Sequence, residues 1–302
     1  MADLTEPETD TTDPEEATTT EEEDIDVIKD LELQVLKESL QGRSANTIKT
    51  YTSIYEKLYA ALGKEVHQAS QKLIISTADQ MSQNANTRAA IINIGILVRR
   101  LYRLDVKELE KLRKNNKKTI ETHTNKVNQS LDLPTLDQFD THIEHLYHTN
   151  KYQDFIINYL IRHLCCRNQD LSFDIVTRQR DVPKNNKNYM WLGRQKATLY
   201  RRDYKTDKTY GEKINIITDL KFRTALKRLL AKKVTRVVPS DSPIGYHIKK
   251  ASFNELGEGA LFKVVVNDAR EKGDLHRLTE ISKLRGTDVC TIAASYNVQK
   301  LQ

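Results

Sequence analysis

The stretch that decides the interpretation of this chain lies near its end: Leu284-Arg285-Gly286-Thr287-Asp288-Val289-Cys290-Thr291-Ile292-Ala293-Ala294-Ser295-Tyr296-Asn297. It contains a basic residue before a glycine, a small polar turn, a short apolar run that suits a helix, and a tyrosine. The chain has 13 tyrosines, and most tyrosines pack a ring and point the hydroxyl at water. The segment alone therefore does not indicate a function, and its interpretation depends on the residues that precede it.

Basic residues precede this segment in a set order. Arg167 ends a strongly apolar predicted helix, Lys205 lies in a predicted turn, and Lys263 lies in a predicted helix over 258–272. When a side-chain oxygen cleaves a phosphodiester, charge builds on the non-bridging oxygens and on the leaving oxygen. Fixed cations can meet the first charge and a proton donor the second. This order is the one that a DNA strand transferase with a tyrosine nucleophile needs.

Composition excludes several classes of protein. The 302 residues favour two domains, and no apolar run approaches the ~20 residues of a membrane span. The N-terminus lacks the basic-then-apolar order of a signal peptide. Cys165 and Cys166 are adjacent and Cys290 is remote, so no C-x-x-C pair suggests a disulfide framework or a zinc site. We expect a reduced, intracellular protein with no metal, no cofactor and no membrane segment.

The charge is divided unevenly along the chain. Residues 1–26 carry twelve acidic residues and no Lys or Arg, so against a total of +6 the remaining residues carry +18. So basic a body suits a polyanion partner. The leader is too poor in apolar residues to offset chain entropy, and residues 1–27 are predicted to be a disordered acidic tail. That tail either competes with DNA for the body or aids solubility.

Residues 28–127 show helical periodicity and are predicted to form a helical DNA-binding domain. Helices are expected over 45–62, 66–82 and 86–104. Polar and basic residues open the first of these helices, where backbone amides and hydroxyls suit phosphate contacts; the candidates are Arg43, Ser44, Asn46, Thr47 and Lys49. The alternative is an ordinary capped helix start. Basic residues also flank the apolar stripe of the third helix: Arg99, Arg100 and Arg103.

A basic run follows, with six Lys or Arg between Lys107 and Lys118. Such a run is usually a solvated face, and it could also line DNA or serve as a nuclear address. Residues 128–134 are expected to be a linker, because Leu133-Pro134-Thr135 is typical of a domain boundary.

Residues 135–302 are predicted to be mainly helical with a small antiparallel sheet. Helices are expected over 135–148, 151–166, 219–232, 258–272, 275–284 and 288–296, and strands over 188–192, 198–204 and 213–218. The last strand alternates Ile214 and Ile216 with polar neighbours. No internal repeat, phosphate-binding glycine loop or paired-carboxylate metal motif is visible.

The order of these elements resembles the tyrosine recombinase (phage integrase) family. Ser44 to Tyr51 is similar to the start of the family's DNA-wrapping domain, and Arg167 with Asp170-Leu171 resembles the box of the first catalytic arginine. Tyr204-Lys205-Thr206 followed by Gly211 resembles the hairpin lysine. Leu284-Arg285-Gly286 resembles the leucine-glycine-histidine segment, and Tyr296 the nucleophile. The resemblance covers roughly residues 30–298 and is greatest to divergent recombinases of large DNA viruses and mobile elements. Each motif is loose, and the specificity lies in their order and spacing.

The resemblance implies a fold, an activity and a set of roles. The fold would be a helical core-binding (SAM-like) domain followed by an α+β catalytic domain. Tyr296 would form a 3′-phosphotyrosyl link, Arg167, Lys263 and Arg285 would clamp the phosphate, and Lys205 would protonate the leaving group. Asp170 would hold Arg167. The protein would be an integrase that binds double-stranded DNA, self-associates on it, and works in a host nucleus or at a viral replication site.

One box departs from the family pattern. Ala260-Leu261-Phe262-Lys263 stands where His-x-x-Arg is normal, and lysine cannot make the planar two-point grip of arginine on phosphate. Arg285, where histidine or tryptophan is usual, could compensate, and Arg270 is a remoter candidate.

Other interpretations of the same residues stay open. Arg167 could be a helix C-cap cation, Lys208 is a rival to Lys205, and Lys263 and Arg285 could be surface cations. The rival functions are a recombinase-fold DNA-binding protein without catalysis, a type IB topoisomerase-like enzyme, and a helical scaffold for other polyanions.

Overall fold

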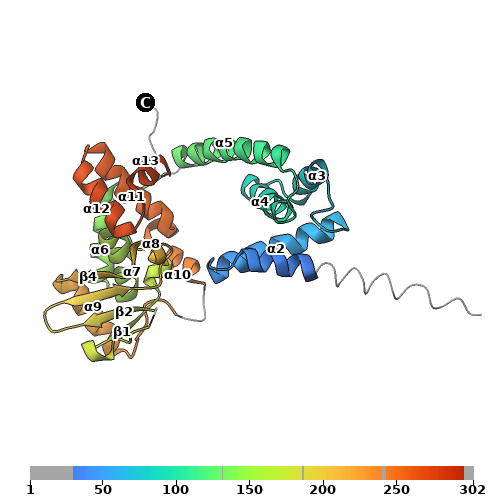
Figure 1. Cartoon of the computed structure of the whole chain (residues 1–302). Coiled ribbons are helices and arrows are strands. Elements are labelled where there is room, and N and C mark those ends of the chain that lie inside the picture. The colour runs from blue at the N-terminus through green and yellow to red at the C-terminus, as the bar shows by residue number, and fades with distance from the viewer. Residues whose placement is uncertain (1–29, 131, 186, 240–242, 296–302) are drawn as a thin grey trace, which may run out of the picture. The chain divides into compact units, whose positions relative to one another are not determined.

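The computed structural model describes residues 30–295 except 131, 186 and 240–242 (Figure 1). The chain forms two compact units, Met1–Thr124 and Asn125–Gln302, each with its own hydrophobic core. The predicted acidic tail, residues 1–27, lies outside the described residues. The predicted fold class, mainly α with a small sheet, is confirmed. In the described part of the chain, no helix is long and apolar enough to cross a membrane.

The first unit is helical throughout its described part. A helix over 30–39 is followed by α2 (Ala45–Leu62), α3 (Gln71–Met81), α4 (Ala85–Leu101) and α5 (Lys107–Ser130). The α2 helix has the bounds that the sequence predicts, because Ser44 caps its first turn and Gly63 ends it in the left-handed conformation. The linker expected at 128–134 begins inside α5.

A buried carboxylate organises the core of the first unit. Glu32 is 1% exposed, and it accepts hydrogen bonds from the Tyr55 hydroxyl (2.7 Å) and from the backbone N–H groups of Val66 and His67 (3.0 Å each). Charge-assisted bonds of this kind offset the loss of water around a buried carboxylate. They join the first helix to α2 and to the loop before α3.

The second unit combines helices with one sheet. Its helices are α6 (Leu136–His148), α7 (Tyr152–Leu164), α8 (Asp207–Tyr210), α9 (Leu220–Ala231), α10 (Ile244–Ala251), α11 (Glu258–Glu271), α12 (Leu275–Arg285) and α13 (Val289–Ser295), with the 3-10 turns η1 (Gln169–Leu171), η2 (Gln179–Asp181) and η3 (Phe253–Glu255). The strands are β1 (Phe173–Val176), β2 (Asn188–Leu192), β3 (Ala197–Arg201) and β4 (Lys213–Ile217).

The sheet is mixed, in the order β1-β2-β3-β4. The three predicted strands pair antiparallel, whereas β1 adds to β2 in parallel. The predicted antiparallel strands are therefore present, and β1 adds a parallel pair at one edge. The four residues of β1 are too few to show a period of two, which explains why the sequence did not reveal them.

The face of β4 is the reverse of what its alternation suggests. A half-buried alternating strand ordinarily turns its apolar side chains inward. Here Ile214 and Ile216 are 55% and 58% exposed, whereas Lys213 and Asn215 are the less exposed pair. The inner face of this edge strand therefore carries the polar Lys213 and Asn215 before the buried Ile217, and its polar part adjoins the site described below.

Two clusters of buried side chains hold the second unit together. The larger one joins α7 and α9 to the inner face of the sheet, through residues such as Ile157, Phe222 and Leu199. The smaller one, with Phe262 and Ile281, packs α11, α12 and the start of α13 around Cys165, at the C-terminal end of α7 (Figure 1). The end of α7 is thus fixed by the last three helices.

Candidate active site

Arg167 lies just beyond the end of α7. The helix ends at Cys165, which adopts the left-handed conformation (φ 52°), and the chain then turns into η1. The fully buried Asp170 accepts a hydrogen bond from the Arg167 backbone N–H through Oδ2, at 2.8 Å. Asp170 therefore contacts Arg167 through the main chain, and its role in holding the Arg167 side chain for catalysis stays a prediction.

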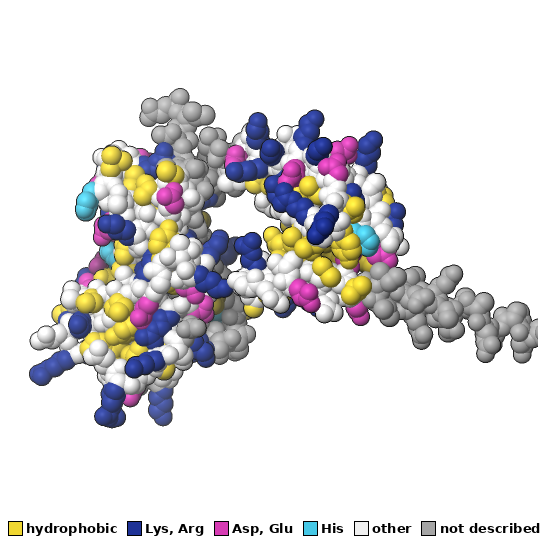
Figure 2. All heavy atoms as spheres, in the orientation of Figure 1, with side chains coloured by type: hydrophobic (Ala, Val, Ile, Leu, Met, Phe, Trp, Pro, Cys, Tyr) yellow, Lys and Arg dark blue, Asp and Glu magenta, His cyan; other side chains and the backbone are white. Residues whose placement is uncertain are grey.

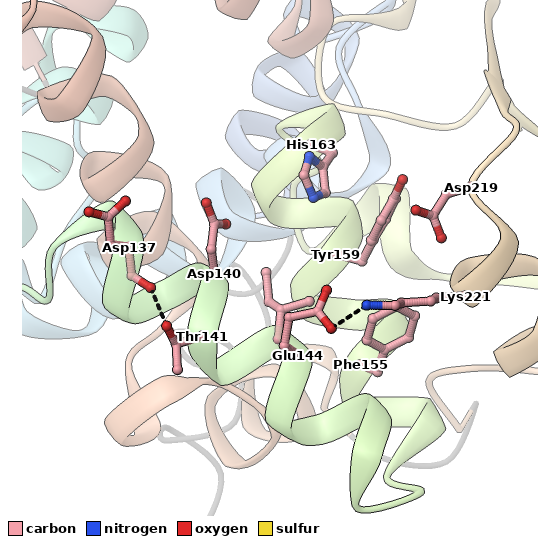
Figure 3. Close-up of a pocket in the computed structure, with 10 residues that line it drawn as sticks. Asp137, Asp140, Thr141, Glu144, Phe155, Tyr159, His163, Asp219 and Lys221 are labelled. Carbon is pink, nitrogen blue, oxygen red and sulfur yellow. Dashed lines mark hydrogen bonds and ion pairs between the residues drawn. The ribbon is translucent and has the colours of Figure 1, made fainter.

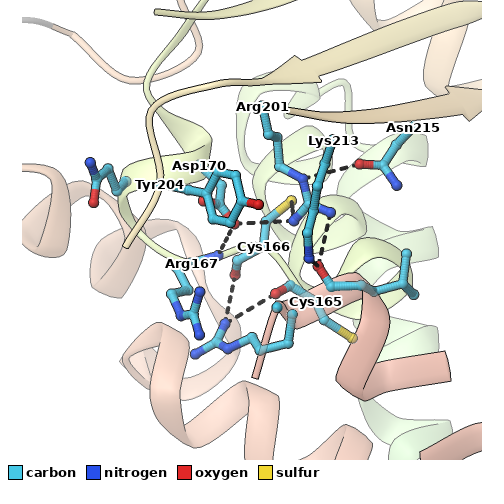
Figure 4. Close-up of polar contacts among 12 residues, drawn as sticks. Cys165, Cys166, Arg167, Asp170, Arg201, Tyr204, Lys213 and Asn215 are labelled. Carbon is cyan, nitrogen blue, oxygen red and sulfur yellow. Dashed lines mark hydrogen bonds and ion pairs between the residues drawn. The ribbon is translucent and has the colours of Figure 1, made fainter. Parts of the chain in front are cut away.

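The Arg167 guanidinium reaches the turn before α13. Its Nη2 donates to the Thr287 Oγ1 at 2.5 Å, across 120 residues of sequence. Thr287 follows Gly286, which ends α12 in the left-handed conformation at φ 62°. Arg167 and the deciding stretch of sequence therefore meet in the fold (Figure 4).

Arg201 is a site residue that the sequence analysis missed. Its side chain is 1% exposed, and Nη1 pairs with the Asp170 Oδ2 at 3.2 Å. Its Nε donates to the Asn215 Oδ1 at 3.0 Å and its Nη2 to the Leu284 carbonyl at 2.9 Å (Figure 4). A signal existed: the period of two in β3 places Arg201 on the same face as the buried Leu199.

The loop between β3 and β4 docks on the same turn. The Thr206 Oγ1 donates to the Gly286 carbonyl at 2.9 Å, and the Lys213 Nζ donates to the carbonyls of Lys283 and, at 3.3 Å, Leu284. Lys205 precedes Thr206 and is exposed. Lys208, its rival in the same loop, is exposed as well. The fold therefore holds the loop that carries the predicted proton donor against the 283–287 turn.

Lys213 is a second residue that the sequence analysis missed. Burial is the larger cause and the positive charge of Arg201 the second, and together they lower the pKa of Lys213 from 10.5 to about 8. Its ammonium lies 5.4 Å from the centres of the Tyr204 and Tyr210 rings. Sequence offered no sign of this, because Lys213 stands in a strand whose isoleucines suggest the opposite face.

Arg285 is buried, at 4% exposed. Its Nη1 donates to the carbonyls of Cys165 (3.1 Å) and Cys166 (3.2 Å) and pairs with the Glu258 Oε1 at 2.5 Å. Its guanidinium also lies over the Phe262 ring, 4.1 Å from the ring centre. These contacts hold the C-terminal end of α7, where a cation complements the helix dipole.

The remaining predicted catalytic residues are less constrained by the structure. Lys263 lies on α11, half-buried, and burial lowers its pKa. Arg270 lies in the last turn of the same helix, one residue before its end. Tyr296 lies outside the described residues, immediately after Ser295, with which α13 ends.

Cations outnumber carboxylates in this network. We call the set Arg167, Arg201, Lys213 and Arg285 the cation cluster. Among the described contacts, the carboxylates that pair with it are Asp170 and Glu258. Positive charges gathered in a partly buried site favour an anion.

The predicted DNA contacts of the first unit divide into two groups. At the start of α2, Arg43, Asn46 and Lys49 are exposed, Thr47 is half-buried, and the Ser44 Oγ accepts the Thr47 N–H at 3.2 Å. This group is open to a ligand.

The second group lies at the end of α4. Arg99 donates to the carbonyls of Asp105 (3.0 Å), His67 (3.3 Å) and Ala69 (2.5 Å), and Arg100 pairs with Glu110. Arg103 is exposed, with φ 55°. Arg99 and Arg100 therefore serve the fold of the unit, whatever else they contact.

A separate cavity of about 590 Å³ lies among α6, α7 and α9 (Figure 3). It is acidic, and three of its four lining carboxylates are engaged: Asp140 makes two bonds to Arg162 (2.6 and 2.9 Å), Glu144 pairs with Lys221 (2.5 Å), and Asp219 caps α9. Within the described residues, no group of three or more His, Cys, Asp or Glu could hold a metal ion. The cavity therefore does not compete with the cation cluster as a site for a polyanion.

Comparison with solved structures gives a structural likeness. No protein-family model matches the chain, and no curated protein matches its sequence. The crystal structure of XerA recombinase is similar over 90% of this chain and 94% of that chain, with 13% sequence identity and a TM-score of 0.37.

Proposed function

We propose that this protein is a DNA strand transferase in which Tyr296 attacks a DNA phosphodiester and forms a 3′-phosphotyrosyl link. The observation that carries the proposal is the meeting of three distant segments: the end of α7 with Arg167, the loop with Lys205, and the 283–287 turn that leads into α13. The sequence motifs that resemble tyrosine recombinases lie on these same segments.

The proposed chemistry needs few parts. The Tyr296 phenol releases its proton to solvent, its oxygen forms a bond to phosphorus, and the bond from phosphorus to the 5′-oxygen breaks. Lys205 gives its proton to that leaving oxygen, while Arg167 and Lys263 bind the non-bridging oxygens. Attack by the 5′-hydroxyl of another strand reverses the step, so the covalent link stores the energy for rejoining. We expect binding to duplex DNA and self-association on it.

Two predicted roles are adjusted in this proposal. Arg285 is buried against main-chain carbonyls and Glu258, so we assign it the positioning of α7 instead of direct phosphate contact. Asp170 and Arg201 likewise position Arg167, because the carboxylate bonds the Arg167 backbone and the Arg201 guanidinium together.

A DNA-binding protein without catalysis is the second candidate. Two observations favour it: lysine stands at position 263 where the family has arginine, and Arg285 is withdrawn from solvent. Both reduce the planar, bidentate cations available to the phosphate.

A trapping experiment separates the candidates. A random-sequence library of nicked suicide duplexes is incubated with the protein, washed in detergent, and the retained DNA is sequenced. We expect a protease-sensitive adduct that is lost in Tyr296→Phe and kept in Tyr210→Phe, since Tyr210 is an exposed tyrosine of the β3–β4 loop.

Three outcomes would redirect the proposal. Binding without any adduct favours the inactive protein. An adduct that survives Tyr296→Phe refutes the assignment of the nucleophile. Relaxation of supercoiled plasmid without strand exchange favours a type IB topoisomerase-like enzyme.

A further inference from the structure

Four lysines form a straight stripe on α5: Lys107, Lys111, Lys114 and Lys118. Their spacings of four, three and four residues place them within about 60° of arc on one helix face. All four are exposed. We call this set the α5 stripe.

The opposite face of α5 fixes the orientation of the stripe. Leu109 is 0% exposed and Leu112 packs against the same core. The Gln71 Oε1 also accepts the backbone N–H groups of Glu108 (3.0 Å) and Leu109 (3.2 Å). This part of α5 is therefore anchored on its unit, and the lysines point away from the anchored side.

The stripe has no ion-paired counter-charge among residues 30–295, as far as these are described. In the described part of the chain, no carboxylate comes within ion-pair distance of its four lysines; Glu110 pairs with Arg100 and Arg113, and Glu121 with Lys117. Like charges three and four residues apart destabilise a helix. An arrangement that breaks this rule so regularly is expected where a ligand supplies the missing negative charge.

We propose that the α5 stripe binds the phosphate backbone of duplex DNA, independently of base sequence. This rests on the proposed function. The twelve residues from Lys107 to Lys118 extend about 16 Å along the helix axis. Each strand of duplex DNA presents a phosphate about every 3.4 Å along the axis of the double helix. Several phosphates of one strand can therefore meet the lysines at once. Figure 2 shows Lys and Arg side chains gathered over this helix.

Duplex DNA fits the stripe better than a lipid surface does. Helices that lie on membranes carry large apolar residues beside their basic face. The positions that flank the stripe on α5 are polar: Glu108, Asn115, Thr122 and Glu121. No large exposed hydrophobic residue occurs on the described part of α5.

The test measures how DNA binding depends on salt, in the full chain carrying Tyr296→Phe so that no adduct forms. Lys111→Gln/Lys114→Gln/Lys118→Gln is compared with Lys37→Gln/Lys57→Gln/Lys64→Gln, which removes the same charge from exposed lysines elsewhere in the unit. Glutamine preserves helix propensity. Circular dichroism confirms that each variant is folded.

We expect the slope of log K against log salt concentration to fall by roughly 2.7 in the stripe variant, at about 0.9 per phosphate contact. This corresponds to an affinity loss of about 500-fold at 0.1 M salt, equal on unrelated duplexes. The control variant should lose far less.

An unchanged slope, or equal losses in the two variants, overturns the inference while leaving the proposed function standing. A stripe variant that loses binding to phosphatidylserine vesicles but keeps its DNA slope also overturns it. If the slope is reduced but the parent protein forms no adduct in the trapping experiment, DNA binding by the α5 stripe is supported and the proposed strand-transferase activity is refuted. If the parent protein binds no duplex DNA, both the inference about the stripe and the proposed function are refuted.

Discussion

Replacement of Arg201 with methionine tests whether the buried network holds the site. The Arg201 guanidinium and the Asp170 carboxylate are each 1% exposed and lie 3.2 Å apart. Methionine removes the positive charge but keeps much of the length and the apolar stem. The Asp170 carboxylate would remain buried and would lose its partner.

The expected cost follows from that burial. Breaking a buried ion pair by removing one partner costs about 3–5 kcal/mol, because the other charge is left uncompensated. Arg201 also loses its bonds to Asn215 and to the Leu284 carbonyl. A domain is stable by only about 5–15 kcal/mol, so the variant should stay folded but marginal.

Trp191 makes the measurement selective. It is the single tryptophan of the chain and lies on β2, so its fluorescence reports the unfolding of the second unit in urea. The matched control is Arg236→Met. The Arg236–Asp174 pair is 2.9 Å long but 35% and 40% exposed, and an exposed pair is worth about 0–1 kcal/mol.

A double-mutant cycle gives the decisive result. Asp170→Asn alone should also be costly, because it leaves the Arg201 charge buried without a counter-charge. Together the two substitutions should cost less than their sum, by about 2 kcal/mol or more. Strict additivity, or a loss in Arg201→Met no larger than in Arg236→Met, would refute the claim that this pair is a coupled buried unit.

Three further predictions concern single residues. First, the pKa of Lys213 is lowered to about 8, so above that pH the folded state binds fewer protons than the unfolded state. The unfolding free energy of the parent, measured relative to that of Lys213→Met, should therefore rise from pH 8 to 10. A difference that stays constant with pH, measured by urea titration with Trp191 fluorescence, would contradict this. Second, Thr287→Val removes the acceptor of the Arg167 Nη2 and should slow adduct formation by about tenfold or more with little change in urea stability, taking about 1.5–3 kcal/mol for a hydrogen bond to a charged group; an unaltered rate would remove Thr287 from the site. Third, Glu32→Gln replaces a buried carboxylate that accepts hydrogen bonds from Tyr55, Val66 and His67, and it should destabilise the first unit by about 2–4 kcal/mol. Hydrogen exchange of the α2 amides measures this loss. Unchanged exchange rates would show that the unit does not need the Glu32 carboxylate.

Local signals in the sequence were sufficient for most of the helices. The bounds of α2 follow from a capping serine, an apolar stripe and a terminating glycine, all of which act within one or two helix turns. The α10 helix was missed because it is eight residues long and begins directly after Pro243. The α5 helix was recognised only as a basic run, since it carries few apolar residues from which a period could be counted.

Candidate site residues could be identified from the sequence where they belong to a recognisable motif. They could not be identified where the role of a side chain depends on contacts that form only in the folded chain. Arg167 and the Gly286 turn were identified from order and spacing, and the structure brings them together. The roles of Arg201 and Lys213 depend on carbonyls 70 or more residues away, so no local pattern could assign them. Burial of Arg285 is likewise set by Glu258 and the end of α7.

The reversed face of β4 ties these observations together. A strand that exposes Ile214 and Ile216 leaves apolar area in water that the opposite register would bury. What offsets this loss is the set of bonds on the inner face, where Asn215 binds Arg201 and Lys213 binds the end of α12. This orientation of β4 is expected if the contacts that hold the β3–β4 loop against the 283–287 turn are more important to the protein than the burial of Ile214 and Ile216. Since that loop carries Lys205 and that turn holds Arg167, the chain gives up local stability at the point where the proposed phosphoryl transfer needs its cations aligned.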